Sequence, residues 1–134
     1  MDILVIDGQG GRLGKEVIER IKAEQLPCTV TAIGTNSLAT AAMLKGGADQ
    51  AATGENAVRV NAPKADLIIG PIGIVIADSL LGEITPAMAV AVGQSPAQKL
   101  LIPVNHCNNR IVGVNDLSMR TLLNGVIEQL KALL

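Results

Sequence analysis

Short apolar runs alternate with amphipathic stretches along most of the chain. The apolar runs predict strands at 2–6, 28–33, 48–52, 66–70 and 99–104. Apolar residues that recur every three or four positions predict helices at 12–25, 38–46, 55–61 and 117–133. A further long helical region follows Gly73 and is interrupted between Gly82 and Pro86. A short extra strand near 111–114 is expected as the far arm of a hairpin.

The regular alternation of strands and helices is typical of βαβ units. Such units build a parallel sheet with right-handed crossovers, and helices then cover both of its faces. We therefore expect an α/β, Rossmann-like, doubly wound and mostly parallel sheet in the order 3-2-1-4-5, with 111–114 as an extra edge strand. No linker, repeat or low-complexity segment interrupts the pattern, so residues 1–134 are predicted to form one domain of nucleotide-binding type.

Composition narrows the function classes. Hydrophobic residues make up 49% of the chain and charged residues 17%, which favours a packed core over disorder. Phe, Tyr and Trp are absent and the net charge is −1, so nucleic-acid binding is not expected. The longest apolar run, 67–77, is too short to span a bilayer, and the N-terminus has no basic segment typical of a signal peptide. A bacterial-type cytoplasm with no membrane partner is the expected location.

The first predicted strand leads into a glycine-rich turn that opens the first helix. Gly8, Gly11 and Gly14 are spaced G-x-x-G-x-x-G, and Gly10 adds a G-x-G. Such glycines allow a tight turn, close approach of backbone amides to a phosphate, and close packing of helix on strand. The helix N-terminus adds unpaired N–H groups and partial positive charge. The predicted ligand contacts are Gly8, Gln9, Gly10, Gly11, Arg12, Leu13 and Gly14.

The alternative is a turn that only packs strand on helix. If Gly11 serves phosphate approach, Gly11→Val abolishes binding and leaves the fold largely intact. A P-loop is excluded because Gln9 stands where its first glycine is required and Glu16 where its Ser or Thr is required. A phosphatase of the haloacid dehalogenase kind is disfavoured because no second aspartate stands two residues from Asp7.

Gly10-Gly11-Arg12-Leu13-Gly14 resembles the dinucleotide-binding fingerprint of extended short-chain reductases and of dihydrodipicolinate reductase, over roughly residues 2–34. The resemblance implies that amides from Gln9 to Leu13 face a pyrophosphate and that Arg12 lies beside the adenosine phosphate. The second strand ends in Gly34-Thr-Asn-Ser37, without the acid that accepts ribose hydroxyls, which favours NADP over NAD. Asp7 places a carboxylate beside the phosphate and would repel it unless amides, a cation or water hold it.

Loops after parallel strands share one edge of the sheet, so two more turns join the predicted cofactor site. Their residues are Gly34, Thr35, Asn36, Ser37, Gly70, Pro71, Ile72 and Gly73. The loop 105–110 contains the only histidine, and His106 and Cys107 are the candidate base and nucleophile or redox thiol. A polar hairpin loop without catalytic role is the alternative. No metal site is expected, because one His and two distant Cys do not match ligand spacing.

The whole chain also resembles a small bacterial single-domain family of unknown function, through the turns already named and through 53–56, 82–86 and 101–103. That resemblance implies no activity. Three functions stay open: a module that binds a dinucleotide or other phosphorylated ligand, a small oligomeric reductase using the loop 105–110, and an interaction protein without ligand. Residues 88–92 are either buried or half of a homodimer interface, and Glu83 either caps the following helix or faces a partner.

Overall fold

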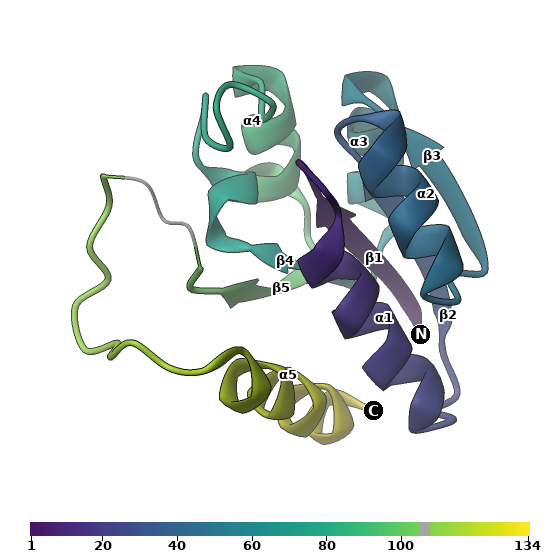
Figure 1. Ribbon diagram of the computed structural model, residues 1–134. Helices are drawn as coiled ribbons and strands as arrows, with labels where there is room; N and C mark the ends of the chain where they lie inside the picture. Colours follow the sequence, from purple (N-terminus) through teal and green to yellow (C-terminus); the bar gives the residue numbers. More distant parts are fainter. Residues whose placement is uncertain (105–107) are drawn as a thin grey trace.

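The computed structural model describes residues 1–104 and 108–134, which contain a five-stranded parallel sheet. The strands are β1 (Asp2–Asp7), β2 (Thr29–Gly34), β3 (Gln50–Thr53), β4 (Leu67–Pro71) and β5 (Gln98–Ile102). Their order is β3-β2-β1-β4-β5, and all four neighbouring pairs run parallel (Figure 1). The predicted doubly wound, Rossmann-like α/β fold is therefore confirmed.

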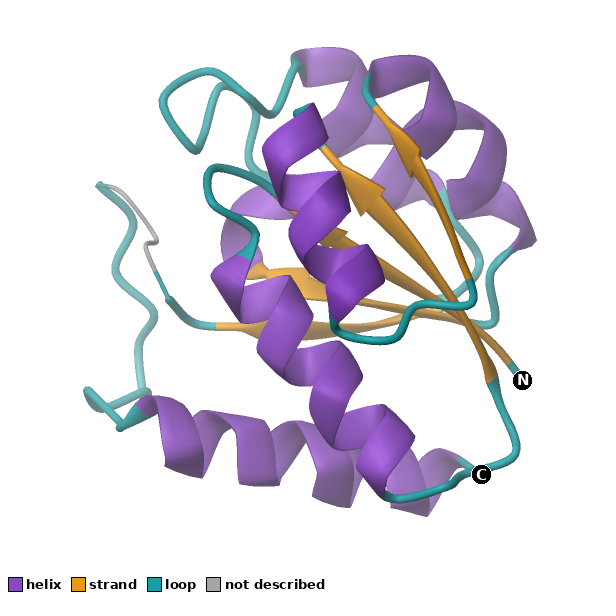
Figure 2. Cartoon of the chain, turned by 45° about the vertical axis from the view of Figure 1, so that its right-hand side comes forward, coloured by secondary structure: helices purple, strands orange, loops and turns teal. Residues whose placement is uncertain are grey.

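Helices cover both faces of this sheet (Figure 2). They are α1 (Arg12–Ala23), α2 (Ser37–Lys45), α3 (Glu55–Asn61), α4 (Pro86–Gln94) and α5 (Met119–Leu133), with 3-10 turns at Ala62–Lys64 and Ile72–Val75. The first core packs α1, α5 and Met43 of α2 on one face, and the second packs α3 and α4 on the other. The first two crossovers, through α1 and α2, therefore lie on one face, and the next two, through α3 and α4, lie on the other.

Alternation along β1 explains why its whole run is apolar. Ile3 and Val5 enter the core beneath α1 and α5, whereas Leu4 and Ile6 enter the core beneath α3 and α4. All four are at most 2% exposed, because successive side chains of a strand point to opposite faces and both faces are covered here. The central strand is therefore covered on both faces, and its last residue, Asp7, lies at the switch point between β1 and β4, where the strand order reverses.

Two sequence-based expectations are wrong. Residues 111–114 form a turn closed by the Val114 N–H and the Ile111 carbonyl (3.3 Å), so the extra edge strand is absent. Gly113 has a φ of +85° and Val112 is 99% exposed, which leaves this segment without a partner strand or a core to enter. The long helix expected after Gly73 is also absent, since residues 76–85 form turns and α4 begins only at Pro86.

The apolar segment 88–92 lies mostly in the core. Met88, Ala89 and Val92 are buried against the sheet, and Val90 is exposed. Packing of α4 against the sheet therefore accounts for most of this apolar run. The run no longer supports the predicted homodimer.

Candidate functional site

The glycine corner is the turn of residues 8–11 between β1 and α1. The Gly11 N–H donates to the Gly8 carbonyl at 2.9 Å, and Gln9 and Gly11 have φ values of +51° and +72°. No side chain caps the start of α1. Among the described residues, the N–H groups of Gly10, Arg12 and Leu13 have no hydrogen-bond acceptor. They form an unpaired set of donors at a helix N-terminus.

A hollow of about 120 Å³ lies over these donors. Its lining is residues 7–13 together with Pro71 and Leu80. Sites that enclose a whole small ligand usually measure about 300–1,000 Å³, so this hollow has room for a phosphate group and not for a complete dinucleotide. The rest of any larger ligand would lie on the surface outside it.

The glycines at positions 10, 11 and 14 differ in what a side chain would meet there. A β-carbon on Gly11 would lie 2.7 Å from the Ala39 carbonyl oxygen, and one on Gly14 would lie 2.9 Å from the Asp7 Cβ. These two glycines allow α1 to pack against α2 and β1. A β-carbon on Gly10 would have no heavy atom within 4 Å, so packing does not require a glycine at this position of the lining.

The carboxylate of Asp7, a residue that lines the hollow, is hydrogen-bonded to the backbone of the turn and of α1. It accepts the Gly8 N–H at 2.8 Å and the Gly14 N–H at 2.7 Å. Burial raises the pKa of Asp7, the two amide hydrogen bonds partly offset that rise, and the charge of Glu83 adds to it. The carboxylate that sequence reasoning placed against a phosphate is thus engaged by amides.

Glu83 is the residue at this edge that sequence reasoning left unassigned. Its Oε1 accepts the Gln9 N–H at 2.9 Å, the Thr35 hydroxyl at 2.5 Å and the Asn36 side-chain amide at 2.8 Å. Burial alone would raise the pKa of Glu83, but the hydrogen bonds from Thr35, Gln9 and Asn36 outweigh it and hold that pKa below its ordinary value. The helix that follows is capped instead by Thr85, whose hydroxyl accepts the Met88 N–H at 3.2 Å.

The turn after β2 lies at the same edge and is occupied by internal contacts. Asn36 caps α2 by accepting the Ala39 N–H at 2.9 Å and also donates to the Gln9 carbonyl at 3.0 Å. The Thr35 N–H donates to the Asp7 carbonyl, and Ser37 begins α2. A β-carbon on Gly34 would overlap the Thr40 hydroxyl, so this glycine is required for packing.

The turn after β4 borders the hollow only through Pro71. A β-carbon on Gly70 would lie 2.5 Å from the Ile6 carbonyl, which makes Gly70 a packing residue between β4 and β1. The Gly73 carbonyl accepts the Ser79 hydroxyl, and Ile72 begins a 3-10 turn. The structure therefore brings the three predicted turns to one edge, but of the predicted contact residues it places only residues 8–13 and Pro71 around the hollow.

The candidate catalytic residues His106 and Cys107 lie outside the described residues. Residues 108–118, which follow them, run out beside the body of the domain before α5 begins (Figure 1). In the described part of the chain, no group of three or more His, Cys, Asp or Glu side chains is placed to hold a metal ion.

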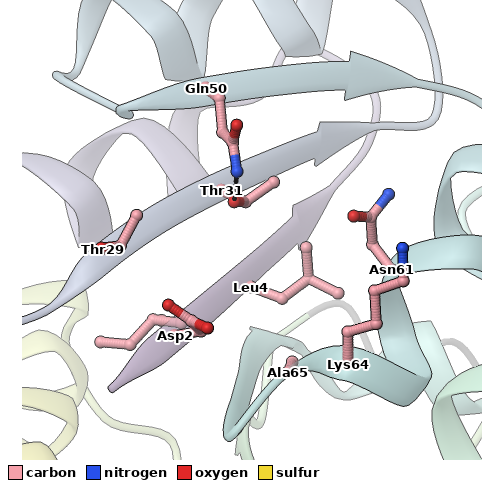
Figure 3. A pocket seen from close by; sticks show the side chains of 9 residues that line it. Asp2, Leu4, Thr29, Thr31, Gln50, Asn61, Lys64 and Ala65 are labelled. Atoms are coloured by element: carbon pink, nitrogen blue, oxygen red, sulfur yellow. Dashed lines mark hydrogen bonds between the residues drawn. The ribbon is translucent and has the colours of Figure 1, made fainter.

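A larger hollow, of about 170 Å³, lies at the opposite edge of the sheet (Figure 3). Asp2, Thr29, Thr31, Gln50, Asn61 and Lys64 line it. It lies at the beginnings of β1, β2 and β3, whereas ligands of open parallel sheets bind beyond the strand ends. Part of its polar lining is paired internally, since Gln50 donates to the Thr31 hydroxyl at 2.9 Å. The smaller glycine corner, with its unpaired backbone donors, is the better candidate.

Comparison with known proteins identifies the family and no activity. The family model described as "Domain of unknown function (DUF3842)" matches residues 2–134. The chain belongs to this family. No curated protein and no solved structure matches it. Among the described helices, none combines the length and apolar content needed to cross a membrane.

Proposed function

We propose that this member of the DUF3842 family is a binding module for a phosphorylated small ligand, with one phosphate group held at the glycine corner. The observation that carries the proposal is the set of N–H groups of Gly10, Arg12 and Leu13, which have no acceptor in the described structure and face a hollow of phosphate size. Such donors at the positive end of a helix favour an anion. A dinucleotide, NADP or NAD, and a simpler phosphorylated metabolite both meet this requirement.

Arg12 supplies the cationic side chain at the rim. Its side chain is 89% exposed, and its Nε makes an ion pair with Glu16 at 3.3 Å, within the first turns of α1. Exposed pairs of this kind contribute at most about 1 kcal/mol, so the side chain is able to turn toward a second phosphate at low cost. Because Arg12 can reach a second phosphate next to the one at the glycine corner, we expect a diphosphate ligand rather than a monophosphate.

The other functional expectations stay predictions. The small reductase depends on a loop whose candidate residues lie outside the described part, and the cytoplasmic location and homodimer have no further observation behind them. The preference for NADP rested on small polar residues after β2, and Thr35 and Asn36 of that turn now donate to the Glu83 carboxylate. A 2′-phosphate would meet this negative charge.

Pyrophosphate at about 100 times its dissociation constant is expected to stabilise the fold by about 2.7 kcal/mol. Gly10→Val is expected to abolish that gain, because it adds a bulky side chain at a residue that lines the hollow and carries one of the unpaired N–H groups. Gly93→Val is the matched control, since a β-carbon there also has no heavy atom within 4 Å but lies on α4. A dye-based melt measures both, because the chain has no Trp or Tyr.

The proposal fails if pyrophosphate leaves the melting temperature of the wild-type protein unchanged. It also fails if Gly10→Val retains the full shift, because the ligand would then bind away from the glycine corner.

A further inference from the structure

Glu83 brings a carboxylate to the end of β2 from a distant part of the chain. In doubly wound nucleotide-binding sheets, an acid at the end of the second strand accepts ribose hydroxyls. Here β2 ends in Gly34, followed by Thr35 and Asn36, and neither side chain is an acid. Glu83, which follows β4, fills that role in space, because its Oε1 is hydrogen-bonded to both Thr35 and Asn36.

The same carboxylate also contacts the glycine corner. Its Oε1 accepts the Gln9 N–H at 2.9 Å, and Gln9 is one of the residues that line the hollow. A β-carbon on Gly8 would lie 3.1 Å from that oxygen. A phosphate held over Gly10, Arg12 and Leu13 would therefore place the next group of the ligand beside Glu83.

The two carboxylate oxygens of Glu83 differ in their hydrogen bonding. Three donors hold Oε1, whereas Oε2 has no hydrogen-bond partner among the described residues. The structure has no buried side-chain N or O atom without a hydrogen-bond partner among the described residues, so the unpartnered Oε2 is exposed and open to a ligand. Because the hydrogen bonds to Oε1 already hold the carboxylate, the side chain loses little conformational entropy when Oε2 accepts a hydroxyl.

The loop behind Glu83 is held in place at several points. Asp78 donates its N–H to the Ile84 carbonyl at 2.7 Å, and Leu80 is only 4% exposed in the core under α4. Asp78 and Leu80 have φ values of +66° and +55°, which are uncommon for non-glycine residues. The Glu83 N–H also donates to the Leu80 carbonyl at 3.2 Å, so backbone hydrogen bonds on both sides of Glu83 tie it to this loop.

We infer that Glu83 is the specificity-determining residue of the phosphate site: its free oxygen accepts a hydroxyl of a sugar diol next to the bound phosphate, and its charge rejects a phosphate at that hydroxyl. This inference rests on the proposed function. It assigns the ligand to the class of ribonucleotides with a free 2′-hydroxyl, so that NAD is selected over NADP. This is the reverse of the preference that the residues after β2 suggested by themselves.

NAD and NADP are the matched probes, because they differ only in the 2′-phosphate, and pyrophosphate reports on the phosphate corner without a sugar. We expect calorimetric titration of the wild-type protein to give about tenfold or greater preference for NAD, as expected for like charges in contact at a partly exposed site. Glu83→Gln removes the charge and keeps an oxygen acceptor, so it should reduce the preference to about threefold or less. Glu128→Gln, an equal charge change at an exposed position of α5, should keep the wild-type preference.

Each outcome decides the matter. Equal affinities in the wild-type protein, or tighter binding of NADP, overturn the inference and leave the proposed function intact if pyrophosphate binds. A gain of NAD affinity in Glu83→Gln overturns it as well, because Glu83 would then block the sugar. If the wild-type protein binds pyrophosphate and neither dinucleotide, the inference alone falls. If it binds none of the three probes, the proposed function fails and the inference with it. The wild-type ratio decides even if Glu83→Gln does not fold.

Discussion

Replacing Gly11 by valine is expected to destabilise the fold by about 3 kcal/mol or more, since it combines a left-handed backbone with overlap against a neighbouring helix. The φ of Gly11 is +72°, and a β-carbon there would lie 2.7 Å from both the Cα and the carbonyl oxygen of Ala39. Backbone atoms of α2 cannot move aside as a flexible side chain can. α1 would have to separate from α2, and the packing of Met43 in the core beneath them would be lost.

Urea unfolding followed by circular dichroism measures this loss. The control is Gly10→Val, the same change one residue earlier, where a β-carbon meets open space and the expected change is within about 1 kcal/mol. Equal stability of the Gly11→Val variant and the wild-type protein would show that Gly11 is not a packing residue. The sequence-based expectation of a largely intact fold in Gly11→Val would then hold after all.

Replacing Asp7 by alanine is expected to cost about 2–4 kcal/mol of stability, because it leaves two buried amides without their acceptor. Those amides belong to Gly8 and Gly14, and Asp7, whose carboxylate accepts their N–H groups, is 6% exposed. Thermal unfolding of the two proteins gives the difference. A loss below about 0.5 kcal/mol, the size of an ordinary surface substitution, would contradict the role assigned to these hydrogen bonds.

The advantage of the wild-type protein over Asp7→Ala should also depend on pH. Folding raises the pKa of Asp7, chiefly through burial, so the folded state favours the protonated form. The stability that this group contributes is fully present below about pH 4 and is lost as the pH rises through the raised pKa. All other titrating groups are common to the two proteins. A difference that instead grows with rising pH would mean that the amides, and not burial, dominate the pKa of Asp7.

Local patterning was sufficient to predict the sheet and its order. Three local patterns predicted elements that the fold contains. They are the apolar run of β1, the glycine turn between β1 and α1, and the helical spacing of Leu123, Val126, Ile127 and Leu130 in α5. The right-handed crossover rule then leaves few arrangements of the strands. The meeting of the turns after β1 and β2 at one edge follows from the same rule.

The contacts of Glu83 could not be predicted in this way. They join residues separated by 48 and 74 positions in the chain, and they depend on three non-glycine residues with positive φ. No local sequence pattern predicts such a loop, and the apolar residues of this segment led to the incorrect prediction of a helix. The one available signal was a carboxylate beside Gly82 inside an otherwise apolar segment. The strand expected at 111–114 failed for a related reason, since Val112 and Val114 suit a strand only where a partner strand exists.

The most direct test of the central claim is a titration of ¹⁵N-labelled protein with pyrophosphate, followed by the amide resonances. The account predicts saturable shifts at the N–H groups of Gly10, Arg12 and Leu13, with α5 amides such as Leu130 unchanged. Shifts confined to residues around the opposite hollow, such as Thr31 and Gln50, or no saturable shift at all, would contradict it.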